Sequence, residues 1–553
     1  MARRIVVIGG GAAGASAAAK ARRHDEEADI VLLNEGRDIS YGACGIPYWI
    51  SGVIPSIGAL MVFSPRRFGA RYNVSVRNFT RVREIKAEQK KVIVEHVREH
   101  EVYQLSYDSL IICTGARPVL PDVFRVEGPI FALRNLVDAE KLKSFLKEYT
   151  PQSALVVGAG LIGLEMTENL QKIGVKVTLL EATDQVLPSL DLEMASIVHA
   201  ALKRSGTAVL TGQAARVVEV KAPDRVVVTT SKGETIETNL IVVSVGVEPN
   251  SELCESAGLK YGPRRTIFTE RDMSTGVEGI WAAGDCTHSW SAVTGQPLWL
   301  PLGSVANKQG RTAGANAVGQ ALKLSPMVGS TIAKVMDLTV AKVGLSQKEA
   351  ESAGMKVICS YTHPFDRAHY YPGAEMLSVK LIAEESTGAI VGAQIIGREG
   401  VDKRADVFAM AIYNRMTCDE LGNVDLHYAP PFAPAKDVCN VAAYVADDIR
   451  RGLERVVAPQ EVDQDFVSRS DQVLIDVRTP EEYQMGHIPG AINVPLDVLR
   501  EQSDSLDRRK RIVLYCKTGL RSYLALRILA NKGFEDVWHI GGGYVSWEES
   551  FGG

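Results

Sequence analysis

Two cysteines lie in sequence surroundings that favour thiol chemistry. Cys44 is in a Gly/Pro-rich stretch, ISYGACGIPYWISG, that spans residues 39–52. Cys516 follows an apolar run and opens the segment CKTGLR. The remaining cysteines are at positions 113, 254, 286, 359, 418 and 439, with no CxxC pair and no Cys/His cluster at zinc spacing. We expect most of them to be core residues, and we predict neither structural disulfides nor a metal site.

The two thiols predict different chemistry. The residues after Cys44 read GIP, which predicts a helix start whose free N–H groups lower the pKa of the thiol. Because no second cysteine is nearby, an oxidised Cys44 must be a mixed disulfide with a small thiol, a persulfide or a sulfenic acid. In the other segment, successive N–H groups between Cys516 and Arg521 would point inward and stabilise a thiolate or a persulfide anion.

A glycine-rich turn near the N-terminus predicts a dinucleotide site. The segment RIVVIGGGAAGASAAAKARR places an apolar strand before the glycines and an Ala-rich helix after them. Gly9 allows a tight turn, Gly11 lets a pyrophosphate approach the backbone, and Gly14 lets helix pack on strand. A ribose-binding side chain is expected after the strand DIVLLNEG, where Asn34, 20 residues after Gly14 (34 − 14), and Glu35 are both candidates.

The same pattern occurs a second time, in ALVVGAGLIGLEMTENL, with Gly158, Gly160 and Gly163. Its second strand, VKVTLLEA, ends on Glu181, 18 residues after Gly163 (181 − 163). A carboxylate at this place accepts hydrogen bonds from a free ribose 2′-hydroxyl and repels a 2′-phosphate. The second site is therefore predicted to prefer NADH over NADPH.

Composition limits the partners. A chain of 553 residues suggests about three or four domains. A net charge of −4 argues against nucleic acid or an anionic membrane as the main partner, because either favours a clustered basic excess. The N-terminal MARRIVVIGGGAAG reads as neither a signal peptide nor a membrane span, so we expect a cytoplasmic protein.

Two further segments, YDSLIICTGARP (107–118) and GIWAAGDC (279–286), resemble flavin-binding signatures of the pyridine nucleotide disulfide oxidoreductase family. With them the resemblance covers about residues 1–445. It implies FAD as a cofactor, with Asp285 hydrogen-bonded to the ribityl chain and the turn of Thr114 and Gly115 beside the flavin. Most disulfide reductases of this family use two cysteines, but here positions 39 and 49 are Ile39 and Trp49.

The stretch around Cys44 resembles the single-cysteine group of coenzyme A disulfide reductases and persulfide reductases, as do AHYYPGAE (368–375) and LHYAPPFAPAKD (426–437). This resemblance implies a homodimer in which Tyr370 and Tyr428 reach the active-site sulfur of the partner subunit. The substrate-contacting positions that it implies, with one nearby candidate last, are Arg23, Ser40, Lys436 and Arg71. The sequence departs from the group at Ala43 and Tyr72, which could weaken or reshape coenzyme A binding.

The C-terminal segments VLIDVRTPEEYQMGHIPGAINVPL (473–496), VLYCKTGLRS (513–522) and HIGGGYVSW (539–547) resemble the rhodanese family in order and spacing. Four residues separate Cys516 from Arg521 (521 − 516 − 1), which is the sulfur-transfer length, whereas rhodanese-like phosphatases have one residue more. An inactive interaction module is the alternative, but such modules usually lack the cysteine. We expect Asp476, Arg478 and His487 to be structural.

These patterns predict an α/β chain with two Rossmann-like dinucleotide-binding domains, an α+β dimerisation domain and a C-terminal rhodanese-like α/β domain. The predicted ranges are 1–150 and 238–325 for FAD, 151–237 for NADH, 326–445 for dimerisation, 446–460 for a linker and 461–553 for the rhodanese domain.

The joint prediction is an FAD-dependent enzyme that uses NADH to reduce coenzyme A persulfide, polysulfide or related sulfane sulfur to hydrogen sulfide and thiol through Cys44, while Cys516 transfers sulfur. The alternatives are a coenzyme A disulfide reductase, an NADH oxidase or peroxidase that forms a Cys44 sulfenic acid, and a non-catalytic redox sensor or sulfur carrier. The sequence leaves open the sulfur donor and whether sulfur passes from Cys516 directly or through coenzyme A.

Overall fold

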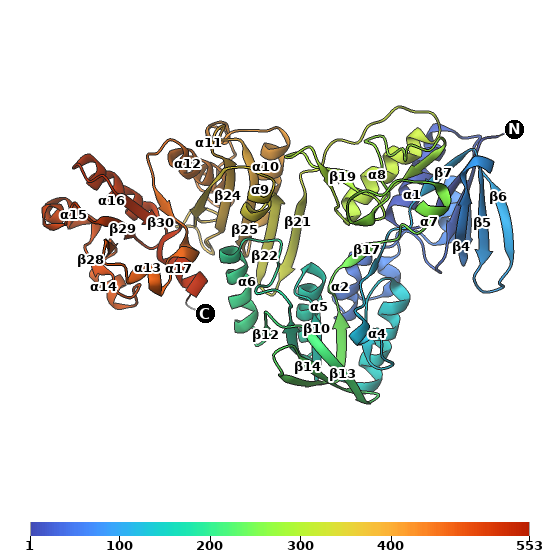
Figure 1. Ribbon diagram of the computed structural model, residues 1–553, viewed down its shortest axis with the longest axis horizontal. Coiled ribbons are helices and arrows are strands. Elements are labelled where there is room, and N and C mark those ends of the chain that lie inside the picture. Colours follow the sequence, from blue (N-terminus) through green and yellow to red (C-terminus); the bar gives the residue numbers. More distant parts are fainter. Residues whose placement is uncertain (1, 552–553) are drawn as a thin grey trace. The chain divides into compact units, whose positions relative to one another are not determined.

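The computed structural model describes residues 2–551. The chain forms two compact units, and each is described by itself. Unit 1 comprises Met1–Leu180 and Ala214–Met327, and unit 2 comprises Glu181–Gln213 and Val328–Gly553. Figure 1 labels the helices and strands of both.

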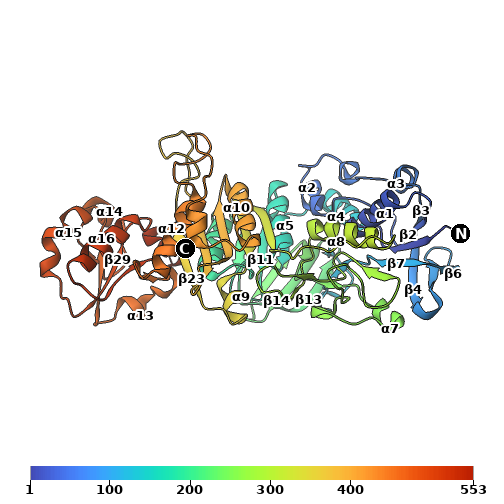
Figure 2. The ribbon, with the colours of Figure 1, turned by 90° about the horizontal axis from the view of Figure 1, so that it is seen from above.

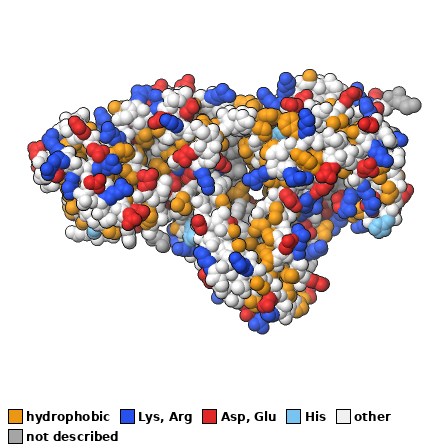
Figure 3. Space-filling view, viewed as in Figure 1, with side chains coloured by type: hydrophobic (Ala, Val, Ile, Leu, Met, Phe, Trp, Pro, Cys, Tyr) orange, Lys and Arg blue, Asp and Glu red, His pale blue; other side chains and the backbone are white. Residues whose placement is uncertain are grey.

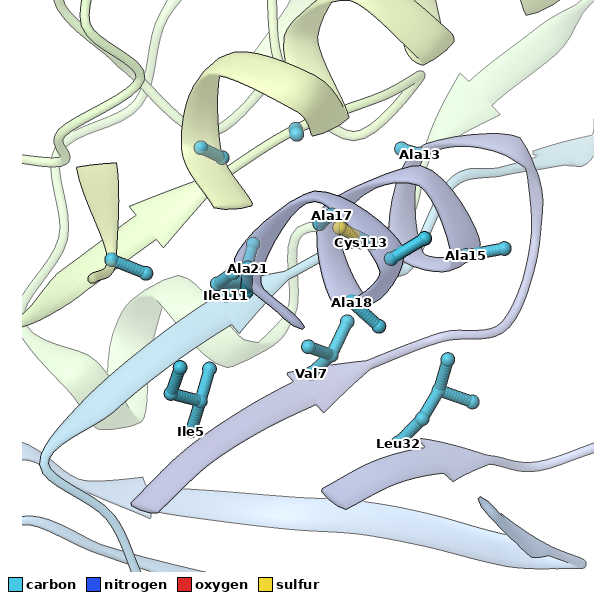
Figure 4. Close-up of a cluster of buried hydrophobic side chains, with 14 of the residues drawn as sticks. Ile5, Val7, Ala13, Ala15, Ala17, Ala18, Ala21, Leu32, Ile111 and Cys113 are labelled. Carbon is cyan, nitrogen blue, oxygen red and sulfur yellow. The ribbon is translucent and has the colours of Figure 1, made fainter. Parts of the chain in front are cut away.

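Unit 1 contains a parallel sheet with strand order β18-β7-β1-β2-β3. Its strands are β1 (Arg4–Ile8), β2 (Asp29–Asn34), β3 (Val74–Asn78), β7 (Ser109–Ile112) and β18 (Ile280–Ala282). Figure 4 shows small side chains of α1 (Ala12–His24), such as Ala18, beside Ile5 and Val7 of β1. The apolar runs of the sequence thus form buried strands covered by a helix.

Two helices of this sheet pack at backbone distance. A Cβ atom on Gly310 of α8 (Gly303–Asn316) would lie 2.2 Å from the carbonyl oxygen of Ala13, and one on Gly314 would lie 2.2 Å from that of Ala17. Only glycine fits at such an approach. The glycines of α8 therefore allow its close packing on α1, whose N-terminus follows the first glycine turn.

A second parallel sheet of unit 1 includes the order β11-β10-β16-β9. Its strands are β9 (Ile130–Phe131), β10 (Ser153–Val157), β11 (Lys176–Leu180) and β16 (Leu240–Val243). Antiparallel strands flank the two sheets: β4 (Thr80–Lys86), β5 (Lys91–His96), β6 (Val102–Ser106), β13 (Ala215–Ala222), β14 (Arg225–Thr230) and β15 (Thr235–Thr238). Shorter pairs are β8 (Ala116–Pro118) with β17 (Val247–Pro249), and β19 (Ser289–Trp290) with β20 (Pro297–Leu298). The other α-helices are α2 (Ile46–Ile50), α3 (Pro65–Tyr72), α4 (Leu136–Tyr149), α5 (Leu161–Lys172) and α7 (Leu253–Ala257).

Unit 2 contains an antiparallel sheet with order β21-β22-β25-β24-β23. Its strands are β21 (Ser330–Val335), β22 (Leu338–Gly344), β23 (Val357–Thr362), β24 (Ser378–Glu384) and β25 (Ile390–Gly397). The helices beside it are α9 (Gln347–Ser352), α10 (Val401–Tyr413), α11 (Cys418–Gly422) and α12 (Val438–Arg450). The segment 181–213 contributes α6 (Leu192–Arg204) and β12 (Ala208–Leu210).

A buried ion cluster ties the segment 181–213 to this sheet. Lys380 of β24 is fully buried, and its Nζ lies 2.9 Å from a carboxylate oxygen of Asp191 and 2.5 Å from one of Glu193. Gln394 of β25 donates from Nε2 to Asp191 at 2.6 Å. Residues 181–213, which the sequence predicts to be part of the NADH-binding domain, therefore belong to unit 2 by their packing.

The C-terminal part of unit 2 is a parallel sheet of order β26-β30-β29-β27-β28. Its elements are β26 (Val456–Val457), α13 (Gln464–Val467), β27 (Gln472–Asp476), α14 (Pro480–Gln484), β28 (Ile492–Asn493), α15 (Leu496–Gln502), β29 (Arg511–Tyr515), α16 (Leu520–Asn531), β30 (Val537–Ile540) and α17 (Gly543–Phe551). Ile512 and Leu514 of β29 pack with α15 and α16, whereas Val513 and Tyr515 pack with α13 and α17. Helices thus cover both faces of the sheet, as Figure 2 shows for α16 and α13.

The predicted fold class is confirmed, since two strand–glycine turn–helix units, an antiparallel sheet with helices and a small parallel α/β domain follow one another. Residues 446–460, which the sequence predicts to be a linker, instead contribute to a helix and a strand. Their first part completes α12 through Arg450, and Val456 and Val457 form β26, which pairs with β30. A two-residue strand carries too little periodicity to be recognised in a sequence.

Surface and composition give few further features. On the face that Figure 3 shows, Lys and Arg side chains are interspersed with Asp and Glu. Within residues 2–551 no helix combines the length and the apolar character that crossing a bilayer requires. The same residues contain no group of His, Cys, Asp and Glu side chains that could hold a metal ion.

Candidate active sites

The first glycine turn has the geometry of a phosphate cradle. Gly9 has φ +100°, and a Cβ there would lie 2.1 Å from the carbonyl oxygen of Cys113. A Cβ on Gly14 would lie 1.8 Å from the carbonyl oxygen of Gly9, whereas a Cβ on Gly11 would meet no atom of the described chain within 4 Å. Gly11 is also the N-cap residue of α1, and it provides no side-chain cap. Open space above uncapped helix N–H groups suits a pyrophosphate.

The second turn repeats this geometry at the start of α5. Gly158 has φ +100° and a Cβ there would lie 2.5 Å from the carbonyl oxygen of Ser244. A Cβ on Gly163 would lie 1.9 Å from the Gly158 carbonyl oxygen, while that of Gly160 would have no described atom within 4 Å. The two turns therefore have the same geometry on different sheets, and both suit an anion.

The candidate ribose-binding residues differ in their hydrogen bonds. Asn34 accepts from the Gly10 N–H at 3.1 Å and donates to the Gly36 carbonyl at 2.8 Å, so its amide holds the turn itself. Glu35 forms an exposed ion pair with Arg81 at 2.6 Å. Glu181 is buried, and its Oε1 accepts from the N–H and the hydroxyl of Thr183 at 2.8 and 2.9 Å.

Asp285 fits the role of a flavin ligand. It follows β18, and its Oδ1 is buried with no hydrogen-bond partner among residues 2–551. Burial raises the pKa of this carboxyl to about 6. An unpaired buried carboxylate oxygen is costly unless a donor from a ligand satisfies it, and a ribityl hydroxyl is such a donor. Thr114 and Asn250 exchange hydrogen bonds of 2.6 and 2.8 Å, which hold the turn that contains Gly115.

Cys44 lies in an exposed 3₁₀ turn, Ala43–Gly45, directly before α2. The prediction that the helix start lowers the pKa of the Cys44 thiol is wrong. Desolvation raises the pKa of the thiol, and the negative charges of Glu165 and Asp285 raise it further. The helix has only five residues, so its N-terminus offers little positive potential against two carboxylates.

Glu165 and Tyr48 are neighbours of Cys44 that sequence reasoning missed. The Tyr48 hydroxyl donates to Oε1 of Glu165 at 3.4 Å. Burial and this carboxylate raise the pKa of Tyr48 to about 12, and burial raises the pKa of Glu165. Their positions in the sequence could have indicated them. Tyr48 is one helical turn after Cys44, and Glu165 comes two residues after the last glycine of the second motif.

The structure places the candidate substrate contacts in both units. In unit 1, Arg23 is exposed at the end of α1, and the Arg71 guanidinium lies 5.3 Å from the centre of the Phe63 ring. Ser40 has φ +48°, a strained backbone for a non-glycine residue. Lys436 is exposed in unit 2, directly before α12.

Tyr370 and Tyr428 are brought together in unit 2. Their hydroxyl groups are 3.3 Å apart, and the residues are 65% and 51% exposed. The hydrogen bond with Tyr428 raises the pKa of Tyr370. Two adjacent exposed phenols form a surface that can donate hydrogen bonds to a group outside the subunit.

Cys516 is buried at the end of β29 and is enclosed by its own loop. Its Sγ accepts a hydrogen bond from the Gly519 N–H at 3.2 Å and one from the Ser522 hydroxyl at 3.6 Å. Gly519 has φ +108°, which turns its N–H inward, and it directly precedes α16. This loop can stabilise negative charge on the sulfur with protein groups alone.

Arg521 has a carboxylate partner that the sequence did not suggest. Its two terminal nitrogens donate to the two oxygens of Glu482 at 2.7 and 2.8 Å. The guanidinium lowers the pKa of Glu482 to about 2, so the pair is ionised at neutral pH. Glu482 also belongs to a capping box with Thr479 at the start of α14.

The three residues expected to be structural have local partners. Arg478 and Asp476 are both buried and form an ion pair of 2.7 Å beneath the site. Arg478 also donates to the Gly486 carbonyl at 2.6 Å. The His487 ring stacks on Tyr483 with a centroid distance of 3.9 Å.

Comparison with known families defines the class of the protein. Residues 3–316 match the model described as "Pyridine nucleotide-disulphide oxidoreductase", residues 330–438 match its dimerisation domain, and residues 458–550 match the rhodanese-like domain. The chain therefore belongs to the pyridine nucleotide-disulphide oxidoreductase family and carries a C-terminal rhodanese-like domain. It is a flavin-dependent oxidoreductase, and its family uses FAD with NAD(P)H.

Three similar proteins have three different names. An NADH oxidase of Methanocaldococcus jannaschii is 31% identical over 424 residues, which cover 76% of this chain and 93% of that protein. The structure of reduced Bacillus anthracis CoADR-RHD has a TM-score of 0.95 and 36% identity, covering 100% of this chain and 99% of that one. An NAD-dependent persulfide reductase from A. fulgidus has a TM-score of 0.92 and 37% identity, covering 98% and 100%.

Proposed function

We propose that this protein is a homodimeric, cytoplasmic enzyme that uses NADH and FAD to reduce coenzyme A persulfide or polysulfide to hydrogen sulfide and thiol. One observation carries the proposal. The same chain contains a flavoprotein cysteine with no second cysteine beside it, Cys44, and a rhodanese-like loop whose Gly519 N–H donates to its own cysteine, Cys516. A persulfide is the substrate that links the two sites, because Cys516 can carry it and Cys44 can reduce it.

The proposed reaction balances as NADH, a proton and R–S–SH giving NAD⁺, R–SH and H₂S. The Cys44 thiolate attacks the S–S bond at either sulfur. Attack at the carrier sulfur releases sulfide and leaves a Cys44 mixed disulfide, whereas attack at the outer sulfur frees the carrier thiol and leaves a Cys44 persulfide. Both products are two-electron oxidised forms of Cys44, and bound FAD supplies the electron path from NADH that returns them to the thiol.

Several features of the chain support this assignment. The glycine turns and Asp285 suit FAD and NADH, and the buried Glu181 carboxylate supports NADH over NADPH. The cations Arg23, Arg71 and Lys436, with Ser40, are proposed to hold coenzyme A. The paired hydroxyls of Tyr370 and Tyr428 are proposed to donate to the sulfur at the site of the partner subunit. We also propose the four predicted domains with their ranges, without a separate linker at 456–457.

Two other reactions are favoured by specific comparisons. The likeness to reduced CoADR-RHD favours coenzyme A disulfide reduction, and the NADH oxidase relative favours oxygen as the acceptor. Both reactions use the same thiol, as a mixed disulfide in one and as a sulfenic acid in the other. The presence of Cys516 in an intact loop distinguishes the main proposal, since neither of these two reactions needs it.

The test mixes the purified protein anaerobically with NADH and coenzyme A persulfide, polysulfide or coenzyme A disulfide. NADH oxidation and sulfide release are followed together in the wild type, Cys44→Ser, Cys516→Ser and the matched control Cys359→Ser. We expect persulfide to be the fastest substrate, Cys44→Ser to lose on the order of 10³-fold, Cys516→Ser to slow the polysulfide reaction alone, and the control to behave as wild type.

Other outcomes identify the alternatives. A faster reaction with coenzyme A disulfide, unaffected by Cys516→Ser, would make the protein a disulfide reductase. Fast consumption of oxygen or peroxide without a sulfur substrate would make it an oxidase or peroxidase. If NADH does not reduce the bound flavin at all, the protein is a redox sensor or sulfur carrier.

A further inference from the structure

A row of buried polar side chains lies behind Cys516 and none of the motifs includes it as a whole. Glu454, Ser522 and His539 are 4%, 0% and 2% exposed. They come from three places in the chain: Glu454 precedes β26, Ser522 lies in the first turn of α16, and His539 is on β30. Buried polar groups are retained when they satisfy one another or do chemistry.

The three side chains form a continuous path to the sulfur. Oε1 of Glu454 lies 2.5 Å from Nε2 of His539, and Nδ1 of His539 lies 3.2 Å from Oγ of Ser522. Oγ of Ser522 is in turn 3.6 Å from Sγ of Cys516. Glu454 thus reaches the reactive sulfur through two hydrogen-bonding groups.

The number of hydrogens on Ser522 and His539 limits which of them can donate to the sulfur. The Ser522 hydroxyl has a single hydrogen and three neighbours that could take it: the Gly519 carbonyl at 2.8 Å, Nδ1 of His539, and Cys516 Sγ. If Nδ1 accepts this hydrogen, the hydroxyl cannot donate it to the sulfur. If Nδ1 carries a hydrogen and donates to Oγ, the serine hydrogen is free to turn toward a negatively charged sulfur.

Glu454 provides the acceptor that the second arrangement needs, since its Oε1 lies 2.5 Å from Nε2 of His539. A ring that donates from Nε2 to Glu454 and from Nδ1 to Ser522 leaves the hydroxyl hydrogen to the Gly519 carbonyl or to Cys516. Negative charge on Sγ favours Cys516, because a hydrogen bond to a charged acceptor is the stronger one.

We propose that Glu454, His539 and Ser522 form a relay that directs a hydroxyl donor at Cys516 Sγ whenever this atom carries negative charge. Ser522 touches the reacting atom and is a catalytic residue, whereas His539 and Glu454 are positioning residues. The inference rests on the proposed function, in which Cys516 carries sulfane sulfur.

The relay serves both steps of sulfur transfer. In the first, the Cys516 thiolate attacks the outer sulfur of R–S–SH, a new Sγ–S bond forms, the S–S bond of the donor breaks and R–S⁻ leaves. In the second, an acceptor thiolate or cyanide attacks the outer sulfur and Cys516 leaves as its thiolate. No net electrons are exchanged in either step. Sγ is negatively charged at the start of the first and at the end of the second, so a donor there favours the thiolate form that attacks and stabilises the thiolate that departs.

The experiment isolates Cys516 from the flavin site. It uses the full-length protein with Cys44→Ser, supplies glutathione persulfide as the sulfur donor and cyanide as the acceptor, and measures thiocyanate without NADH. We expect Ser522→Ala to lower kcat about 10- to 100-fold, the range for a hydrogen bond to a charged group. Ser522→Thr, which retains the hydroxyl, should keep most of the activity.

A double-mutant cycle separates a relay from a structural role. His539→Phe and Glu454→Gln should each lower kcat in the parent but should add no further loss in the Ser522→Ala background, because they act through this hydroxyl. Ser503→Ala is the matched control, since Ser503 is also a fully buried serine of this domain. Its hydroxyl donates to the Arg500 carbonyl and accepts from Lys532. It should leave kcat unchanged, and thermal melting curves report the folding of every variant.

The outcomes are distinct. Full activity of Ser522→Ala, or losses from His539→Phe that are the same with and without Ser522, would overturn the relay while Cys516 remains a sulfur carrier. A parent protein that forms no thiocyanate, or forms it equally well with Cys516→Ser, would overturn the proposed sulfur transfer and the relay with it. NADH-dependent persulfide reduction through Cys44 is a separate measurement and would stand in both cases.

Discussion

Cys44 and Cys516 are both proposed to handle sulfane sulfur, yet their protein surroundings differ in origin and in charge. The donors around Cys516 come from residues 519 and 522, within one loop and the helix that follows it. The charged groups around Cys44 come from distant parts of the chain, Glu165 and Asp285, and both are acids. The donors at Cys516 suit a negatively charged sulfur, whereas the acids near Cys44 oppose that charge.

This difference indicates how the two thiols are activated. The Cys516 loop directs the Gly519 N–H at the sulfur and places the Ser522 hydroxyl beside it, and this geometry supports the proposed sulfur transfer. At Cys44, two carboxylates and desolvation raise the pKa of the thiol. The flavoprotein thiol therefore remains protonated to higher pH than an ordinary cysteine unless positive charge is brought to the site.

Among the changes that test this difference without removing either cysteine, the largest effect is expected from the glycine of the Cys516 loop. Gly519→Ala forces a side chain onto a backbone with φ +108°, a conformation that costs about 1–3 kcal/mol. The loop should relax and move the N–H away from Cys516 Sγ. We expect a loss on the order of 10²-fold in thiocyanate formation, with unchanged NADH-driven reduction of coenzyme A disulfide.

Gly533→Ala is the control for this change, because Gly533 has φ +86° in the same domain but lies at the end of α16. It should affect thermal stability and leave sulfur transfer intact. If both glycine variants lose activity equally, the contrast between the two cysteine sites does not depend on the loop donor.

The second effect concerns the charge opposite Cys44. Glu165→Gln removes a negative charge that raises the pKa of the thiol, so this pKa should fall and the thiolate fraction at a fixed pH below it should rise. We expect iodoacetamide to modify Cys44 about 3- to 10-fold faster at pH 7. The measurement is the pH dependence of modification in a Cys516→Ser background, followed by peptide mass spectrometry.

Glu252→Gln is a matched control, since Glu252 is an exposed carboxylate of the same unit that pairs with Arg117. It should leave the rate at Cys44 unchanged. An equal rate for Glu165→Gln and wild type at every pH would show that desolvation alone raises the pKa, and the charge contrast between the two sites would be lost.

The same contrast explains what could be predicted from the sequence. The glycine turns and the Cys516 loop are local, so the spacing of Gly9, Gly14 and Cys516 indicated their geometry directly. The acids around Cys44 lie 121 (165 − 44) and 241 (285 − 44) residues away, and no local pattern connects them. Glu454 was missed for another reason, because it falls in residues that composition predicted to be a linker.

The third effect tests whether Arg521 is free to bind an anionic sulfur donor. Glu482 neutralises the guanidinium through two hydrogen bonds, which disfavours the dianion thiosulfate relative to an organic persulfide. Glu482→Gln should raise kcat/KM for thiosulfate about 3- to 10-fold and change the value for glutathione persulfide less. The adjacent Glu481→Gln is the control and should alter neither.

The pH dependence of this pair follows from its pKa. The folded pKa of Glu482 is lowered to about 2, so the ion pair is complete above the ordinary carboxyl range and is lost only as the pH falls toward 2. The donor preference of the wild type should therefore be constant from about pH 5 to 8. If the wild type already used thiosulfate as well as Glu482→Gln does, the proposal that Glu482 neutralises Arg521 would be contradicted.

The smallest effect is expected at Tyr48, which donates to Glu165 at 3.4 Å. Tyr48→Phe removes one hydrogen bond from this carboxylate without removing its charge. The pKa of Glu165 should rise, because a hydrogen bond that favours the ionised form is lost. Because the acid itself is retained, the rate of Cys44 modification should change by about twofold or less. A change as large as that of Glu165→Gln would mean that Tyr48 acts on Cys44 directly, and the opposing charge would then be only part of what distinguishes this thiol from Cys516.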